Sequence, residues 1–121
     1  LYIKAFDDYV NRGQVQQGVE CGVKGNALYY AKENLYKEAF DLLRRIDQTI
    51  EAKGQGSAKA AMHYLTSKER FLMYMKMRKT ASIVEQLGNM EKFANASGDE
   101  KLTNDLLYNQ TIYYYTFGQN D

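Results

Sequence analysis

A pattern of apolar and small residues recurs in this chain at a spacing of 42 residues. Tyr30 and Ala39 return as Leu72 and Ala81, and Tyr114 occupies the first position once more. Four further pairs share the spacing: Leu65 and Leu107, Phe71 and Tyr113, Met75 and Phe117, and, in connecting segments, Gly56 and Gly98. Fixed periods of roughly 20 to 50 residues are typical of stacked structural repeats. We therefore expect stacked units that present an extended surface.

The units are expected to be helical. The 121 residues include no proline, which helix interiors exclude, and no alternating run of β-branched residues bounded by turn signals. A hydrophobic fraction of 45% and a charged fraction of 26% are ordinary for one soluble globular domain. The sequence therefore predicts an all-α fold.

Apolar residues at three- and four-residue spacing predict where the helices lie. The clearest is 35–53, and others are expected at 1–10, 14–33, about 57–75, after the basic residues 76–79 as far as 97, and 99–117. Ser57 and Asp99 are expected to be N-caps, and Gly118 to close the last helix in the C′ position. The inward side chains of the later helices are expected to be Ala61, Tyr64, Leu65, Phe71, Leu72, Met75, Ala81, Val84, Leu87, Met90, Ala94, Leu102, Leu106, Leu107, Tyr113, Tyr114 and Phe117.

Three glycines lie inside the expected helix 14–33. Gly18, Gly22 and Gly25 each cost a helix roughly 1 kcal/mol relative to alanine. This helix is therefore expected either to be kinked and loosely packed or to let a neighbouring helix approach closely. A phosphate-binding loop is disfavoured, because no strand precedes the glycines and no Gly-Lys-Ser or Gly-Lys-Thr follows.

The run from Tyr30 to Ala39 resembles the core of a tetratricopeptide repeat, in which an aromatic residue late in helix A packs near a small residue early in helix B. The resemblance covers about 18–121. The chain departs from the family where Asn26, Lys68 and Gln110 replace a leucine, and where the closing proline is absent. Its 42-residue period is also longer than the usual 34, which implies helices about one turn longer.

The resemblance implies a right-handed α-α superhelix of antiparallel helix pairs, in a long-helix variant similar to bacterial signal-transduction proteins. It divides the chain into the second helix of a preceding repeat (1–13), repeat 1 (14–55), repeat 2 (56–97) and the first helix of repeat 3 (98–121). We expect this single domain to be a fragment of a longer protein.

The resemblance also implies that partners bind in a concave groove lined by the first helix of each pair. Carried over by the register of Tyr30, Leu72 and Tyr114, the groove residues are Lys24, Leu28, Lys32, His63, Thr66, Ser67, Arg70, Tyr74, Tyr108, Asn109, Ile112 and Tyr115. Their hydrogen-bonding, cationic and aromatic groups suit an extended peptide.

Catalysis is not expected from this sequence. The single cysteine, Cys21, and the single histidine, His63, match no nucleophile signature and are too few for a metal site, so neither a cofactor nor a metal is expected. A net charge of +1 disfavours nucleic acid and an anionic membrane surface as partners of this segment.

Two hypotheses for function follow. The first is a protein- or peptide-interaction or sensing module in a larger signalling protein. The second is a structural spacer or dimerisation element that stacks on neighbouring repeats through apolar repeat ends. The compartment is open, since the lone cysteine fits a periplasmic sensor region and a cytoplasmic segment equally.

Two further features have alternative interpretations. The basic residues Lys68, Arg70, Lys76, Arg78 and Lys79 are either solvated helix ends or a contact for an anion or acidic peptide. The eleven tyrosines fill either the core or an interface.

Overall fold

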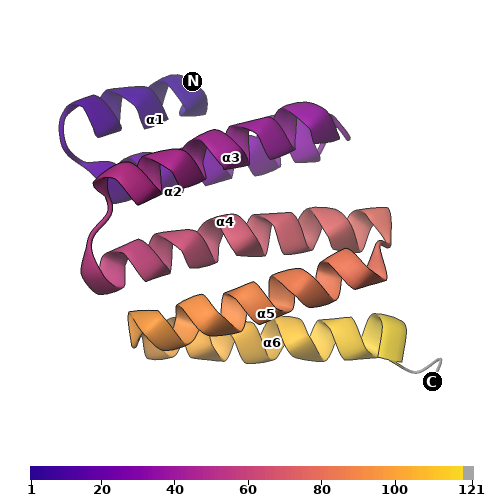
Figure 1. Cartoon of the computed structure of the whole chain (residues 1–121). Coiled ribbons are helices and arrows are strands. Elements are labelled where there is room, and N and C mark those ends of the chain that lie inside the picture. The colour runs from indigo at the N-terminus through magenta and orange to yellow at the C-terminus, as the bar shows by residue number, and fades with distance from the viewer. Residues whose placement is uncertain (119–121) are drawn as a thin grey trace.

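The computed structural model describes residues 1–118 and is shown in Figure 1. Its helices are α1 (Tyr2–Asn11), α2 (Val15–Gly25), the π-helix η1 (Asn26–Ala31), α3 (Tyr36–Lys53), α4 (Gly56–Met77), α5 (Thr80–Ser97) and α6 (Glu100–Phe117). These residues contain no β-strand, so the all-α prediction is confirmed for this part of the chain. The last three residues of the predicted third repeat, 119–121, lie outside the described residues.

The helices are stacked in chain order, from α1 at one end to α6 at the other (Figure 1). Each helix packs on the next one along the chain, and α4 also contacts both α2 and α6. Because α4 lies in the centre, its side chains contact helices in both halves of the molecule. Within residues 1–118, no helix combines the length and apolar character that a membrane crossing requires.

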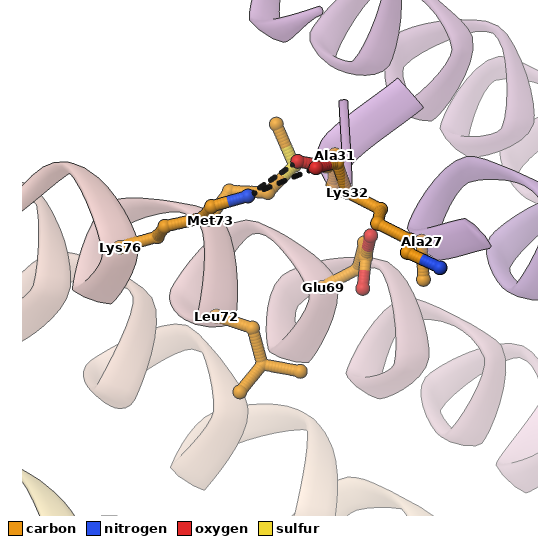
Figure 2. Close-up of a pocket in the computed structure, with 7 residues that line it drawn as sticks. All are labelled: Ala27, Ala31, Lys32, Glu69, Leu72, Met73 and Lys76. Atoms are coloured by element: carbon orange, nitrogen blue, oxygen red, sulfur yellow. Dashed lines mark hydrogen bonds between the residues drawn. The ribbon is translucent and has the colours of Figure 1, made fainter. Parts of the chain in front are cut away.

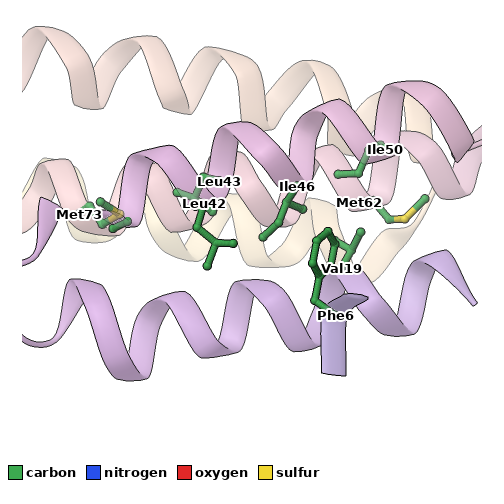
Figure 3. Close-up of a cluster of buried hydrophobic side chains, with 9 residues drawn as sticks. Phe6, Val19, Leu42, Leu43, Ile46, Ile50, Met62 and Met73 are labelled. Atoms are coloured by element: carbon green, nitrogen blue, oxygen red, sulfur yellow. The ribbon is translucent and has the colours of Figure 1, made fainter. Parts of the chain in front are cut away.

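Two clusters of buried side chains form the core, and α4 contributes to both. Met62 and Met73 join the first cluster, which contains Phe6, Val19, Ala39, Leu42, Leu43, Ile46 and Ile50 and is shown in Figure 3. Tyr64 and Phe71 join the second cluster, with Ile83, Met90, Ala94 and Leu106. Because α4 is buried on two sides, its sequence lacks the single apolar stripe of a surface helix.

The glycines of α2 allow close helix packing, as one of the two sequence-based interpretations proposed. A Cβ atom on Gly18 would lie 3.0 Å from the carbonyl oxygen of Phe6, and one on Gly25 would lie 2.5 Å from Cβ of Tyr2. Side chains here would therefore push α1 away from α2. The helix also changes character after Gly25, where Lys32 N–H donates to the carbonyl of Ala27, five residues earlier.

Predictions of helix ends were partly right. Asp99 caps α6, because its carboxylate accepts from the backbone N–H of Lys101 at 2.9 Å. Ser57 is not an N-cap: α4 begins one residue earlier, after Gln55, and Ser57 lies within its first turn. Gly118 does not adopt the left-handed C′ conformation, since its φ is −74°.

The 42-residue recurrence in the sequence is matched only in part by a recurrence in burial: Phe71, Met75, Tyr113 and Phe117 all belong to the second cluster or pack against it. In the first pair, Ala39 is buried and Tyr30 packs against the first cluster. In the later pairs, however, Leu72 is 46% exposed, Tyr114 is 65% exposed and Ala81 is exposed. The register that placed these residues inward is therefore wrong beyond the first pair.

The inward prediction also fails for Val84 and Leu107, which are 52% and 56% exposed. The physical reason is that a helix buries only the sides on which it has neighbours. In the described residues α6 packs mainly on α5 and α4, so apolar positions such as Leu107 on its other sides face solvent.

Candidate functional site

Three of the predicted groove residues, all on α4, lie together against α3. They surround the carboxylate of Asp47, whose Oδ1 accepts from the Thr66 hydroxyl at 2.6 Å and lies 3.3 Å from Nδ1 of His63. Arg70 approaches Oδ2 of the same carboxylate at 2.5 Å. Burial raises the pKa of Asp47, but the hydrogen bonds from His63 and Thr66 and the charge of Arg70 outweigh burial, so this pKa is lowered.

The imidazole of His63 is engaged on several sides. Its Nε2 lies 2.6 Å from Oε2 of Glu51, one turn beyond Asp47, and its ring stacks on Phe93 of α5 with centroids 5.0 Å apart. The hydrogen bond with Asp47 raises the pKa of His63, and the bond with Glu51 adds to this against the opposing effect of burial. This group of residues joins α3 to α4.

The expectation that Thr66, Ser67 and Asn109 present side chains to solvent is wrong, because all three are buried. Asn109 donates within α6, to the backbone carbonyl of Asp105 at 2.8 Å and to its carboxylate at 3.1 Å. Thr66 faces α3, where its hydroxyl donates to Asp47, so the polar side chains of Thr66 and Asn109 both find partners within the protein.

The other predicted residues are spread over the molecule. Tyr74 packs on Phe40 of α3 at a centroid distance of 5.1 Å, and Lys24 lies 5.7 Å over the ring of Tyr2. Leu28, Lys32, Tyr108 and Tyr115 are exposed, and Ile112 is half-buried. The twelve residues therefore do not form one continuous wall.

A pocket lies on another side of α4, where that helix meets η1. It encloses about 200 Å³, and Figure 2 shows its lining residues: Ala27, Ala31, Lys32, Glu69, Leu72, Met73 and Lys76. We call it the η1–α4 pocket. Lys32 is the one predicted groove residue that lines this pocket. The α4 residues that line it lie on a different face of the helix from the predicted α4 residues, on the side of Leu72.

A second hollow, of about 140 Å³, lies further toward the start of α4. It brings together residues of α2, α4 and α6, together with the cap of α6: Gln16, Glu20, Ala61, Met62, Leu65, Asp99 and Leu102. Residues 61, 65, 69, 72 and 76 of α4 follow one another at three- and four-residue spacing, so they share one helix face. We call this face, with both hollows, the α4 groove.

The η1–α4 pocket contains a buried carboxyl group. Glu69 is only 5% exposed, and its Oε2 accepts from Nδ2 of Asn26 at 2.9 Å. Burial raises the pKa of Glu69, although the hydrogen bond from Asn26 and the charge of Lys68 act in the opposite direction. Asn26 is fully buried, and its Oδ1 has no hydrogen-bond partner in the part of the chain that the structure describes.

Lys76 holds the end of η1 against α4. Its ammonium group donates to the carbonyl oxygen of Ala31 at 2.9 Å and to that of Lys32 at 3.4 Å, as the dashed lines in Figure 2 show. These carbonyls lie at the negative end of the helix, where a cation is favourable. Lys76 therefore closes one end of the pocket.

Sequence reasoning missed Asn26 and Glu69, although a signal was present. Asn26, Lys68 and Gln110 were the positions at which a polar residue replaced the leucine of the resembled family. Two of them bridge first helices of the expected pairs: Asn26 bonds Glu69, and Lys68 pairs with Asp105 at 3.0 Å. Polar residues at positions expected in the core thus marked two contacts: that of α2 or η1 with α4, and that of α4 with α6.

The five basic residues of the predicted cluster do not form one patch. Besides Lys68, Arg70 and Lys76, Arg78 lies 4.8 Å over the ring of Phe117. In residues 1–118, no three His, Cys, Asp or Glu side chains gather in a way that could hold a metal ion. Cys21 is a half-buried free thiol on α2.

Comparisons of this chain with protein-family models, with curated proteins and with solved structures find no match.

Proposed function

We propose that this domain is a non-catalytic protein-interaction module that holds a peptide segment of a partner in the α4 groove. One observation carries the proposal: two hollows lie on the same face of α4, between that helix and its neighbours on either side. Apolar walls with a few polar groups are typical of ligand-binding sites.

The length of the groove suits a peptide. Its α4 residues extend from Ala61 to Lys76, which is about 22 Å at 1.5 Å per residue. An extended segment of roughly seven residues spans that distance at about 3.3 Å per residue. Apolar positions such as Leu65 and Leu72 alternate with the charged Glu69 and Lys76, so the face offers both burial and hydrogen bonding.

The resemblance to tetratricopeptide repeats supports the same proposal, since those repeats bind partners along their first helices. α2, α4 and α6 correspond to these first helices, and α4 contacts both of the others. A right-handed superhelical stack and a place in a larger bacterial signalling or sensing protein are part of this proposal.

Selection from a displayed peptide library on the immobilised domain tests the proposal. Selected peptides are expected to lose at least tenfold in affinity for Leu72→Asp, because the substitution puts a charge on the groove wall. Val84→Asp is the matched control: Val84 is an equally exposed aliphatic residue on α5, outside the groove. Equal affinity of the wild type and Leu72→Asp for every selected peptide would reject the proposal.

A second candidate function is self-association through α6. Its exposed side chains include Leu107, Tyr108, Tyr114 and Tyr115, a concentration of apolar area unusual for a free surface. Sedimentation over a wide concentration range is expected to show a dimer that Leu107→Glu dissociates. A monomer at all concentrations would exclude this function for the domain.

A further inference from the structure

The floor of the η1–α4 pocket is energetically unfavourable as it stands. Glu69 is buried beside Ala27, Ala31, Leu72 and Met73, and the amide of Asn26 supplies its one hydrogen bond. An ionised carboxylate in apolar surroundings is stable only when it is well paired. Within residues 1–118, Glu69 therefore has no ion-pair partner in direct contact.

The residue that touches Glu69 is also incompletely satisfied. Asn26 Oδ1 is buried without a partner, and reversing the amide would leave its NH₂ group unpaired instead. A partly satisfied buried polar pair is less favourable than an apolar one, so it needs a reason to be present. Its place at the start of a π-helix is a further sign, since π-helical turns are frequent at functional sites.

We propose that the η1–α4 pocket takes an alkylammonium group, supplied by a lysine side chain of the bound peptide. The ammonium lies toward Glu69, and the methylene stem packs against the apolar walls. This inference rests on the proposed function and specifies its ligand: a peptide with a lysine at the position that enters the pocket. Pairing supplies the counter-charge that Glu69 lacks.

Size and charge both fit this occupant. A pocket of about 200 Å³ accommodates one unbranched side chain. Of the lysines on the rim, Lys76 is seven residues from Glu69 along α4, about 10 Å, and is held by the carbonyls of η1. Its ammonium group is therefore engaged at the end of η1 rather than paired with Glu69. The rim lysines instead favour an acidic group next to the inserted lysine.

Titration with n-butylammonium chloride tests the pocket directly, with NMR of the Met73 and Leu72 methyl groups as the readout. We expect shifts at these methyls with a Kd in the millimolar range, as is usual for so small a ligand. 1-Butanol, which has the same stem without the charge, is expected to bind at least tenfold more weakly. Equal binding of the two compounds would overturn the proposal.

The variant Glu69→Gln keeps the shape of the side chain and removes its charge. It is expected to lose at least tenfold in butylammonium affinity while its Tm stays the same or rises by a few degrees. The matched control is Glu85→Gln, an exposed residue of α5 that lies outside both hollows. A clear fall in Tm for Glu69→Gln, or unchanged butylammonium affinity, would contradict a binding role.

Peptides separate this inference from the proposed function. Among selected peptides, replacing the lysine by norleucine is expected to weaken binding to the wild type but not to Glu69→Gln. Peptides that depend on Leu72 but not on Glu69 or a lysine would overturn the inference and leave the proposed function standing. Butylammonium binding without any lysine-dependent peptide would reject the peptide source and indicate a free amine.

Discussion

Two carboxylates next to α4 differ in how completely they are partnered. Asp47, on the α3 side, receives a hydroxyl, a guanidinium and an imidazole from α4. Glu69, on the η1 side, receives one amide. The pKa of Asp47 is lowered although burial raises it, whereas burial keeps the pKa of Glu69 raised. The pKa values of the half-buried Asp47 and the buried Glu69 are thus shifted in opposite directions.

The difference lies in the number of donors that the surrounding helices bring to each oxygen. α4 brings several polar and charged groups to Asp47 of α3, while η1 lines the pocket of Glu69 with Ala27 and Ala31 and supplies a single amide. A carboxylate that accepts from several donors stabilises the contact between the helices that carry them. A carboxylate with one donor remains available for a ligand.

Asp105 on α6 resembles Asp47 in having several hydrogen-bond partners. It accepts from the hydroxyl of Tyr64 at 2.6 Å and from Lys68 at 3.0 Å, so it joins α6 to α4 as Asp47 joins α3 to α4. Burial, followed by the hydrogen bond and charge of Asp105, raises the pKa of Tyr64, so the phenol remains a donor. Two of the three carboxylates therefore hold helices together.

The largest loss of stability is expected for Asp47→Asn. The substitution removes a charge that Arg70 and His63 share, and it should cost about 2–3 kcal/mol and lower Tm by about 10 °C. Thermal unfolding followed by circular dichroism measures the change. Asp41→Asn on the exposed side of α3 is the control and should barely alter Tm, since its partners Lys37 and Arg44 are surface groups.

A smaller loss is expected for Tyr64→Phe. The ring remains in the second core cluster, but the hydrogen bond to Asp105 is lost, which should cost about 1–1.5 kcal/mol. Urea unfolding measures this difference, with the exposed Tyr115→Phe as the control. Equal midpoints for Tyr64→Phe and wild type would show that Asp105 contributes little to the α4–α6 contact.

Glu69→Gln is expected to act in the opposite direction, stabilising the fold by about 1 kcal/mol at pH 7 because an unpaired charge is no longer buried. The raised folded-state pKa means that the native protein binds a proton more tightly than the unfolded chain. In the wild type, the stabilisation that Glu69 contributes is therefore fully present below its pKa in the unfolded chain. It is lost as pH rises through its pKa in the folded protein. The Tm difference between the two proteins should shrink toward zero on acidification.

The smallest effect is expected from His63. Its raised pKa gives a contribution to stability that is fully present below the unfolded pKa of about 6.5 and is lost as pH rises through the folded value. Comparing Tm for wild type and His63→Gln between pH 5 and 9 should show a difference of a few degrees that declines with pH. A difference that grows with pH would mean that Asp47 and Glu51 do not hold the imidazolium.

Helix positions were largely predictable. The limits expected for 35–53 and 99–117 differ from α3 and α6 by one residue at the start, because apolar spacing and a capping aspartate act locally. The glycines of α2 were also interpretable, since a residue without Cβ inside a helix has few structural uses other than close packing.

The direction in which each helix faces was not predictable to the same extent. The resemblance fixed one rotation for α4, placing Leu72 inward and His63, Thr66 and Arg70 on the groove. In the structure Leu72 lines the groove, and the other three contact α3. A helix with apolar residues on several sides does not specify by periodicity which side meets which neighbour.

The sequence by itself determined that the chain folds into helices and roughly where each begins and ends, and it offered close approach of a neighbouring helix as one of two interpretations of the glycines in α2. These properties depend on backbone propensity and on neighbours a turn away. Tertiary structure alone decided that Asp47 would be well partnered and that Glu69 would be buried with one amide, because donors 16 to 43 residues away must be brought within hydrogen-bonding distance. Such contacts depend on how helices are rotated against each other, which no local pattern encodes.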